Sequence, residues 1–157
     1  MSQQDIATIL FPEQMTEIKV SYSNKTPAKD RVKIACSTDC AAYFRKVWSD
    51  KIEYVEEFRI LCLNRANKVL GWATISSGGM SGTVADPKVI FQIALKSCAS
   101  SIILGHNPPS GNLQPSESDI RLTKKLKNAG VSLDLPVLDH IILTTESYYS
   151  FADEGIL

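Results

Sequence analysis

The sequence has no excess of charge of either sign. Its 157 residues include 17 Lys and Arg and 17 Asp and Glu, so the formal net charge at pH 7 is zero. A protein that binds nucleic acid through a broad basic surface usually carries a surplus of Lys and Arg. The balance argues against autonomous nucleic-acid binding, although Arg121, Lys124, Lys125 and Lys127 form one local basic group.

Long hydrophobic segments are also missing. No apolar run approaches the roughly 18 residues that a membrane span requires. The first residues lack the basic segment and the apolar core of a secretion signal. The four cysteines form no CxxC pair, and this predicts reduced and mostly buried thiols at Cys36, Cys40, Cys62 and Cys98. We therefore predict a cytoplasmic protein without a membrane partner.

The chain shows no internal repeat, no low-complexity tract and no domain linker. Apolar residues make up 44% of it, which is ordinary for a globular protein and enough for one core at this length. We predict a loosely attached arm over residues 1–15 and a single domain over residues 16–157.

Strand and helix patterns alternate along this domain. Strands are predicted at 18–23, 32–36, 57–64, 69–76, 102–104, 137–144 and 148–151. Helices are predicted at 37–49, 87–97 and 117–128, the last one ending at Gly130. Hairpins combined with two helical crossovers favour the α/β class, as a three-layer α/β/α domain around a central mixed sheet.

The stretch from residue 101 to residue 119 carries the candidate chemistry. A short apolar strand ends at His106, and Pro108 and Pro109 follow in a loop that neither a strand nor a helix can contain. A helix starts after Pro115 and Ser116. One of only two histidines in the chain therefore lies at a strand–loop–helix junction, where α/β proteins often place functional groups.

The spacing of this stretch resembles the metal-binding motif of the JAB/MPN (JAMM) family, which is H-x-H-P, six residues, then S-x-x-D. His106, Pro109, Ser116 and Asp119 are in register with that motif. The forms N-x-P-S-G and P-S-x-x-D are typical of the RadC-like branch, as is the sequence L-D-H-I-I further along the chain. The second histidine of the family falls on position 108, where this chain has Pro108.

The resemblance implies a JAB/MPN (cytidine-deaminase-like) fold and a zinc hydrolase site. Carried over by position, His106 and Asp119 are the metal ligands and Ser116 helps to stabilise the oxyanion. Glu57 is the candidate base for the zinc-bound water, and the adjacent Glu56 remains an alternative. Such a zinc ion lowers the pKa of its water towards about 7 and polarises the scissile carbonyl.

Several of these residues also have a purely structural interpretation. The side chain of Pro108 offers no lone pair, so the resemblance implies a degenerate site with weak or absent zinc.

Ser116 and Asp119 have the spacing of a helix capping box. His140 follows Asp139 at the start of a strand, and we expect a structural Asp–His pair there rather than a replacement zinc ligand.

Three functions remain in competition. The resemblance implies a relative of zinc metallopeptidases and isopeptidases, in a family that is traditionally labelled as DNA repair proteins. The alternatives are a non-catalytic protein-interaction module and a DNA-repair-associated accessory factor. The helix-hairpin-helix segment of longer RadC-like proteins has no counterpart in this sequence. The expected partner is a protein or a peptide substrate, and a homo-oligomer is compatible with the sequence.

Overall fold

The computed structural model describes residues 19, 21, 23, 25–78 and 85–157. The arm predicted over residues 1–15 lies outside the described residues, as does half of the strand predicted at 18–23. The elements, in chain order, are η1 (Ala28–Asp30), α2 (Ser37–Val47), β1 (Glu57–Leu63), β2 (Val69–Ser77), α3 (Pro87–Lys96), β3 (Ser101–His106), α4 (Glu117–Ser132), β4 (Val137–Leu143) and β5 (Tyr148–Ser150).

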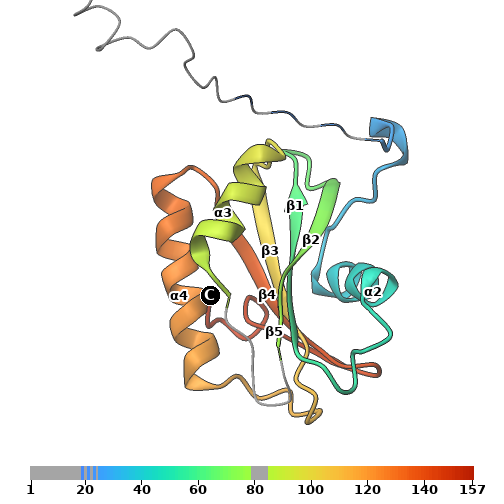
Figure 1. Ribbon diagram of the computed structural model, residues 1–157, viewed down its shortest axis with the longest axis vertical. Coiled ribbons are helices and arrows are strands. Elements are labelled where there is room, and N and C mark those ends of the chain that lie inside the picture. Colours follow the sequence, from blue (N-terminus) through green and yellow to red (C-terminus); the bar gives the residue numbers. More distant parts are fainter. Residues whose placement is uncertain (1–18, 20, 22, 24, 79–84) are drawn as a thin grey trace, which may run out of the picture.

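The described strands form one five-stranded mixed sheet in the order β2-β1-β3-β4-β5. β3 and β4 are parallel, and the other neighbouring pairs are antiparallel. Helix α2 covers one face of the sheet, while α3 and α4 cover the other (Figure 1). The three-layer α/β/α class predicted from the sequence is therefore confirmed.

Alternate residues of β1 belong to two different cores. Every residue of β1 is buried, as expected for an interior strand covered on both faces. Phe58 and Ile60 pack with α3 and α4 in one core. Leu61 and Leu63 pack with Phe44 of α2 in the other. Because neighbouring side chains of a strand point to opposite faces, a shift of one residue decides which layer a side chain enters.

Two element predictions need correction. The segment at 32–36 is not a strand, since its only ladder contact is an isolated bridge between Lys33 and Lys68. Helix α4 does not end at Gly130 but continues to Ser132. A Cβ atom added at Gly130 would lie 2.4 Å from the carbonyl oxygen of Leu135. The glycine therefore permits a close backbone approach within the helix instead of terminating it.

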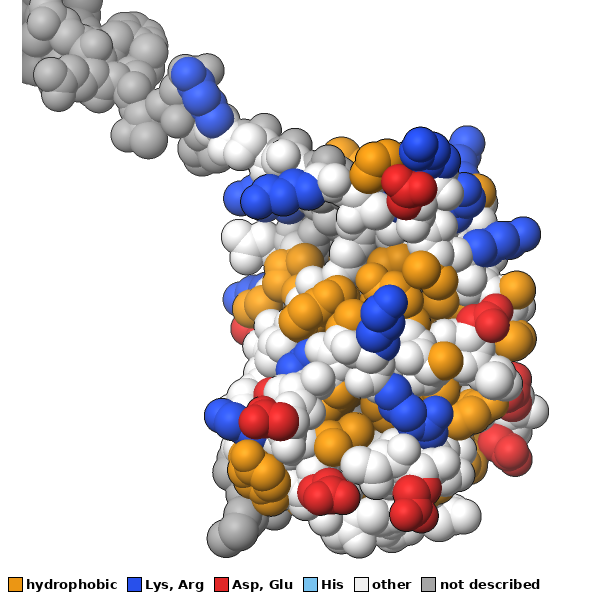
Figure 2. All heavy atoms as spheres, turned by 90° about the vertical axis from the view of Figure 1, so that its right-hand side faces the viewer, with side chains coloured by type: hydrophobic (Ala, Val, Ile, Leu, Met, Phe, Trp, Pro, Cys, Tyr) orange, Lys and Arg blue, Asp and Glu red, His pale blue; other side chains and the backbone are white. Residues whose placement is uncertain are grey.

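The prediction of reduced and mostly buried cysteines is confirmed only in part. All four cysteines are free thiols, but only two are buried, and Cys36 and Cys98 are exposed. On the α2 side of the molecule, Lys and Arg side chains are interspersed with Asp, Glu and apolar groups (Figure 2). That face has no continuous basic surface. Among the described residues, no helix is both long and apolar enough to cross a bilayer.

We expect Gly130→Ala to destabilise the fold, although alanine is the better helix former by about 1 kcal/mol. The added methyl group would collide with the Leu135 carbonyl, and forced overpacking of this kind typically costs about 1–3 kcal/mol. The free energy of unfolding from urea denaturation measures the effect. Gly71→Ala is the matched control, because nothing lies within 4 Å of its added Cβ. Equal stabilities for the two variants would contradict the close approach.

Candidate functional site

His106 is the last residue of β3 and lies on the sheet face that α3 and α4 cover. It pairs with Phe58 of β1, and the two rings are parallel with centroids 6.4 Å apart. Phe58 belongs to the core formed with α3 and α4. The imidazole is therefore buried against an apolar wall at the point where β3 gives way to the loop before α4.

Asp119 reaches His106 from the first turn of α4. Its Oδ1 atom lies 3.7 Å from His106 Nε2. Its Oδ2 atom accepts hydrogen bonds from the backbone N–H and the hydroxyl of Ser116, at 2.8 and 2.6 Å. The Asp119 N–H donates in turn to Ser116 Oγ, which completes a capping box. One carboxylate oxygen thus serves the helix cap, and the other faces the imidazole.

A chain of hydrogen bonds determines which nitrogen of His106 carries the proton. Thr123 Oγ1 donates to the carbonyl oxygen of Asp119 at 2.7 Å, and a carbonyl can only accept. Thr123 Oγ1 must then accept from His140 Nδ1–H, 2.6 Å away. His140 Nε2 is left as the acceptor for His106 Nδ1–H at 2.9 Å. The lone pair of His106 is therefore on Nε2, the nitrogen that faces Asp119.

Burial favours the neutral form of both imidazoles. Burial lowers the pKa of His140 well below its ordinary value, and a charge on His106 would lower it further. Burial also lowers the pKa of His106, although Asp119 opposes that shift. The His140 ring stacks on Phe151 with centroids 4.6 Å apart, which leaves no room for solvent on that side. A neutral pair is what the hydrogen-bond chain requires.

The predicted structural pairing of Asp139 with His140 exists, but through the backbone. Asp139 Oδ1 accepts from the backbone N–H of His140 at 2.7 Å, and Oδ2 accepts from Ser150 Oγ at 2.7 Å. The His140 ring instead joins His106 to Thr123. Both ring nitrogens are used, so His140 supports His106 from behind and does not replace a metal ligand.

Glu57 does not lie with His106. Its Oε2 atom accepts from Arg59 Nη2 at 2.8 Å and from Ser49 Oγ at 2.9 Å. Arg59 also donates to the carbonyl of Val47 at the end of α2. These contacts put the Glu57 carboxylate on the α2 face of the sheet, whereas His106 is on the other face.

The Glu57–Arg59 ion pair belongs to a structural cluster. The Arg59 guanidinium is 4.9 Å from the ring centroids of both Trp48 and Trp72. The two charged side chains are 5% and 7% exposed. The carboxylate is therefore held by Arg59 and Ser49, away from His106. The sequence-based assignment of Glu57 as the base is not supported by its position.

Strand alternation places Glu56, the alternative base, on the same side of the sheet as His106. Its carbonyl accepts from Gly78 N–H at 2.9 Å, so strand pairing extends one residue before β1. Strand alternation then assigns Glu56 to the same face as Phe58 and His106. Between the two neighbouring glutamates, the geometry favours Glu56.

Asn107 fixes the end of β3 to the segment before β1. It is fully buried, and its Oδ1 atom accepts from Glu57 N–H at 2.8 Å. Its Nδ2 group donates to the carbonyls of Ile52 and Val55 at 2.6 and 2.8 Å. These bonds hold the entry of β1 beside His106. The sequence offered Asn107 only as a neighbour of the motif, and its role depends on contacts about 50 residues away.

The residues fit part of a zinc site. His106 Nε2 and Asp119 Oδ1 are 3.7 Å apart, and two ligands of one tetrahedral zinc with bonds of about 2.0–2.1 Å lie about 3.3 Å apart. Catalytic zinc takes three protein ligands. Within the described ranges, no three His, Cys, Asp or Glu side chains are grouped so as to hold a metal. The donor set is one short, and no hydrolytic step through zinc follows from it.

Comparison with known proteins identifies relatives over most of the chain. The family model of the RadC-like JAB domain matches residues 34–156. A UPF0758 protein of Flavobacterium johnsoniae is 50% identical over 101 residues, which cover 64% of this chain and 44% of that protein. UPF0758 proteins of Salinibacter ruber and Porphyromonas gingivalis are each 36% identical, covering 82% and 88% of this chain and 54% and 62% of theirs. The chain spans about half the length of these curated relatives.

We expect both histidines to carry their proton on Nδ1. Long-range ¹⁵N–¹H NMR correlations distinguish the two tautomers directly. Thr123→Val should remove the acceptor of His140 Nδ1–H and lower the free energy of unfolding by about 1–3 kcal/mol, the usual cost of a buried unpaired donor. Thr123→Ser keeps a hydroxyl and serves as the control. An Nε2–H tautomer at His140 in the unmodified protein would contradict the hydrogen-bond chain.

The two histidines should also make stability depend on pH. Because their folded-state pKa values lie below the ordinary 6.5, the unfolded chain binds protons that the folded chain refuses. Their contribution is complete above the unfolded pKa and is lost as the pH falls through the folded values. The slope reaches at most about 1.4 kcal/mol per pH unit per histidine.

Urea denaturation between pH 7.5 and 5.5 measures this slope, and the assignment is simple because the chain has only two histidines. We expect stability to fall with falling pH, and His140→Phe to reduce the slope by about half. A stability that is unchanged over this interval would show that the histidines protonate equally well in the folded state.

Proposed function

Because the chain belongs to the RadC-like JAB domain family, we propose that it is a relative of zinc metallopeptidases that has lost tight zinc binding and acts by binding a protein or peptide. The observation that carries the proposal is Pro108. It occupies the loop two residues after His106, at the position where the resemblance implies the second zinc histidine. Its side chain cannot coordinate a metal.

The remaining donors support binding better than catalysis. His106 and Asp119 supply two ligands, one fewer than a catalytic zinc site needs. The carboxylate of Glu57 is engaged by Arg59 on the other face of the sheet. The hydroxyl of Ser116 donates to Asp119 Oδ2, so it is not directed at an oxyanion. A zinc hydrolase would need a third ligand, a carboxylate base near the metal and a serine hydroxyl free to contact the oxyanion.

Without a metal, the His106–Asp119 pair consists of two hydrogen-bond acceptors. His106 Nε2 carries a lone pair, and Asp119 Oδ1 is a carboxylate oxygen beside it. Such a pair suits a donor such as a peptide N–H or an ammonium group. β2 is one of the two edge strands of the described sheet, and beyond its contacts with residues 32–34 an edge strand of this kind can pair with an extended peptide. These features favour a protein-interaction module in which the His106–Asp119 pair accepts a hydrogen bond from a peptide.

The DNA-associated alternative has less support. The formal net charge is zero, and the α2 side carries charges of both signs (Figure 2). In the local basic group on α4, Arg121 is paired with Glu117 at 3.1 Å. A role in DNA repair would therefore depend on a partner that itself binds DNA.

The substitution Pro108→His tests the proposal by restoring the missing donor. The variant should bind zinc more tightly than the unmodified protein by orders of magnitude, since His106 and Asp119 already converge. Loss of a loop proline costs only about 0.4–1 kcal/mol of stability. Competition with a chromogenic chelator measures the affinity, and zinc should raise the melting temperature of the variant.

Pro109→His is the matched control, because it adds the same imidazole one residue away and should gain little. Asp119→Asn in the Pro108→His background should abolish most of the gain. A folded Pro108→His variant with unchanged zinc affinity would show that Pro108 is not the only obstacle to zinc binding, and it would contradict the proposal.

A further inference from the structure

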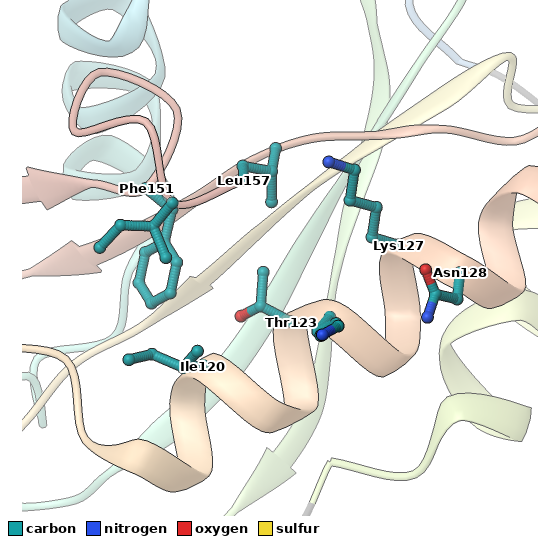
Figure 3. Close-up of a pocket in the computed structure, with 8 residues that line it drawn as sticks. Ile120, Thr123, Lys127, Asn128, Phe151 and Leu157 are labelled. Carbon is teal, nitrogen blue, oxygen red and sulfur yellow. The ribbon is translucent and has the colours of Figure 1, made fainter.

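A pocket lies along α4, between that helix and the C-terminal segment (Figure 3). Its volume is about 360 Å³, within the range of small-molecule sites. Four apolar side chains form much of its lining, namely those of Ile120, Phe151, Ile156 and Leu157. Ile120 directly follows Asp119, so the pocket begins one residue beyond the candidate site.

The two charged side chains of the lining are both lysines. Lys124 and Lys127 contribute the charged groups and Asn128 contributes an amide, whereas the hydroxyl of Thr123 is already engaged by Asp119 and His140. No acidic side chain lines the pocket, but Leu157 is the last residue of the chain and carries its terminal carboxylate. Within the part of the chain that the structure describes, neither lysine forms an ion pair. Two ammonium groups over an apolar floor suit an anion that also carries an apolar body.

The two lysines are distinct from the other basic side chains of α4. At i and i+3, Lys124 and Lys127 occupy the same side of the helix as Ile120 and Thr123. Arg121 pairs with Glu117 and is not part of the lining, and Lys125 is exposed outside the pocket. The local basic group seen in the sequence therefore divides into a pocket pair and an outward pair.

We propose that this pocket binds a small apolar carboxylate. The ammonium groups of Lys124 and Lys127 hold the carboxylate, and the Asn128 amide donates a further hydrogen bond. The hydrocarbon body lies against Ile120, Phe151 and the C-terminal residues. Charge-assisted hydrogen bonds give the orientation, and burial of the hydrocarbon gives much of the affinity.

Such a ligand would lie beside the hydrogen-bond chain of the candidate site. Thr123 lines the pocket, and its hydroxyl bonds His140 Nδ1. Phe151 lines the pocket as well and stacks on the His140 ring. The carboxylate site does not rest on the proposed loss of zinc, because none of its lining residues is a candidate metal ligand.

Titration of the full chain with octanoate, followed by isothermal calorimetry and by amide chemical shifts, tests the proposal. We expect saturable binding with a dissociation constant near the millimolar range, as for a ligand of about ten non-hydrogen atoms. Shift changes should concentrate on residues 120–128 and 151–157. Lys124→Ala and Lys127→Ala should each weaken binding about tenfold, because each removes a charged donor.

Two controls separate a specific site from general hydrophobic or ionic adsorption. Octanol carries the same hydrocarbon without the charge and should bind at least tenfold more weakly. Lys125→Ala removes an exposed lysine of the same helix outside the pocket and should leave the affinity unchanged. Absence of saturation, equal binding of octanol, or an equal loss in Lys125→Ala would each overturn the proposal.

Discussion

The hydrogen bond between His106 and His140 determines most of what the candidate site can do. The direction of this bond is fixed by Thr123, on the other side of His140. Because the Thr123 hydroxyl donates to a carbonyl, it can only accept from His140. The proton of His106 is held on Nδ1, and the lone pair on Nε2 faces Asp119. This is the state of a metal-binding imidazole, and the protein maintains it although one of the donors that a zinc hydrolase needs is missing.

The surroundings of His106 resemble those of a metal ligand on one side only. The support behind His106 resembles the outer layer of a metal site, in which a ligand imidazole is oriented through its second nitrogen. On the side that would face a metal, Pro108 supplies no side-chain atom that could bind one. The pair is a buried imidazole beside a carboxylate, and both groups can accept hydrogen bonds. The proposed loss of tight zinc binding, with retention of the fold, would account for both features of the site.

Much of the fold could be predicted from the sequence because its signals are local. The hairpin of β1 and β2, the Asp86 cap of α3 and the capping box of α4 each depend on residues within a few positions of one another. Gly130 misled the prediction, because its role depends on the Leu135 carbonyl and not on a left-handed helix end.

The site was less predictable because its contacts are between distant segments. His106 meets His140 only through the parallel pairing of β3 and β4, and no periodicity in the sequence specifies that register. Glu56 and Glu57 are adjacent in sequence; the Glu57 carboxylate lies on the α2 face, and strand alternation assigns Glu56 to the other face. The motif spacing therefore located His106 and Asp119 correctly beside each other, and it could not choose between the glutamates.

The central claim is that the chain does not hold zinc tightly. The most direct measurement is the zinc stoichiometry of the unmodified protein, purified without added metal or chelator and analysed by plasma mass spectrometry. The account predicts far less than one equivalent of zinc per chain, removable by brief dialysis, since two protein donors leave the ion short of a catalytic site. One full equivalent that survives dialysis would contradict it and would mean that another group has taken the place of the missing ligand.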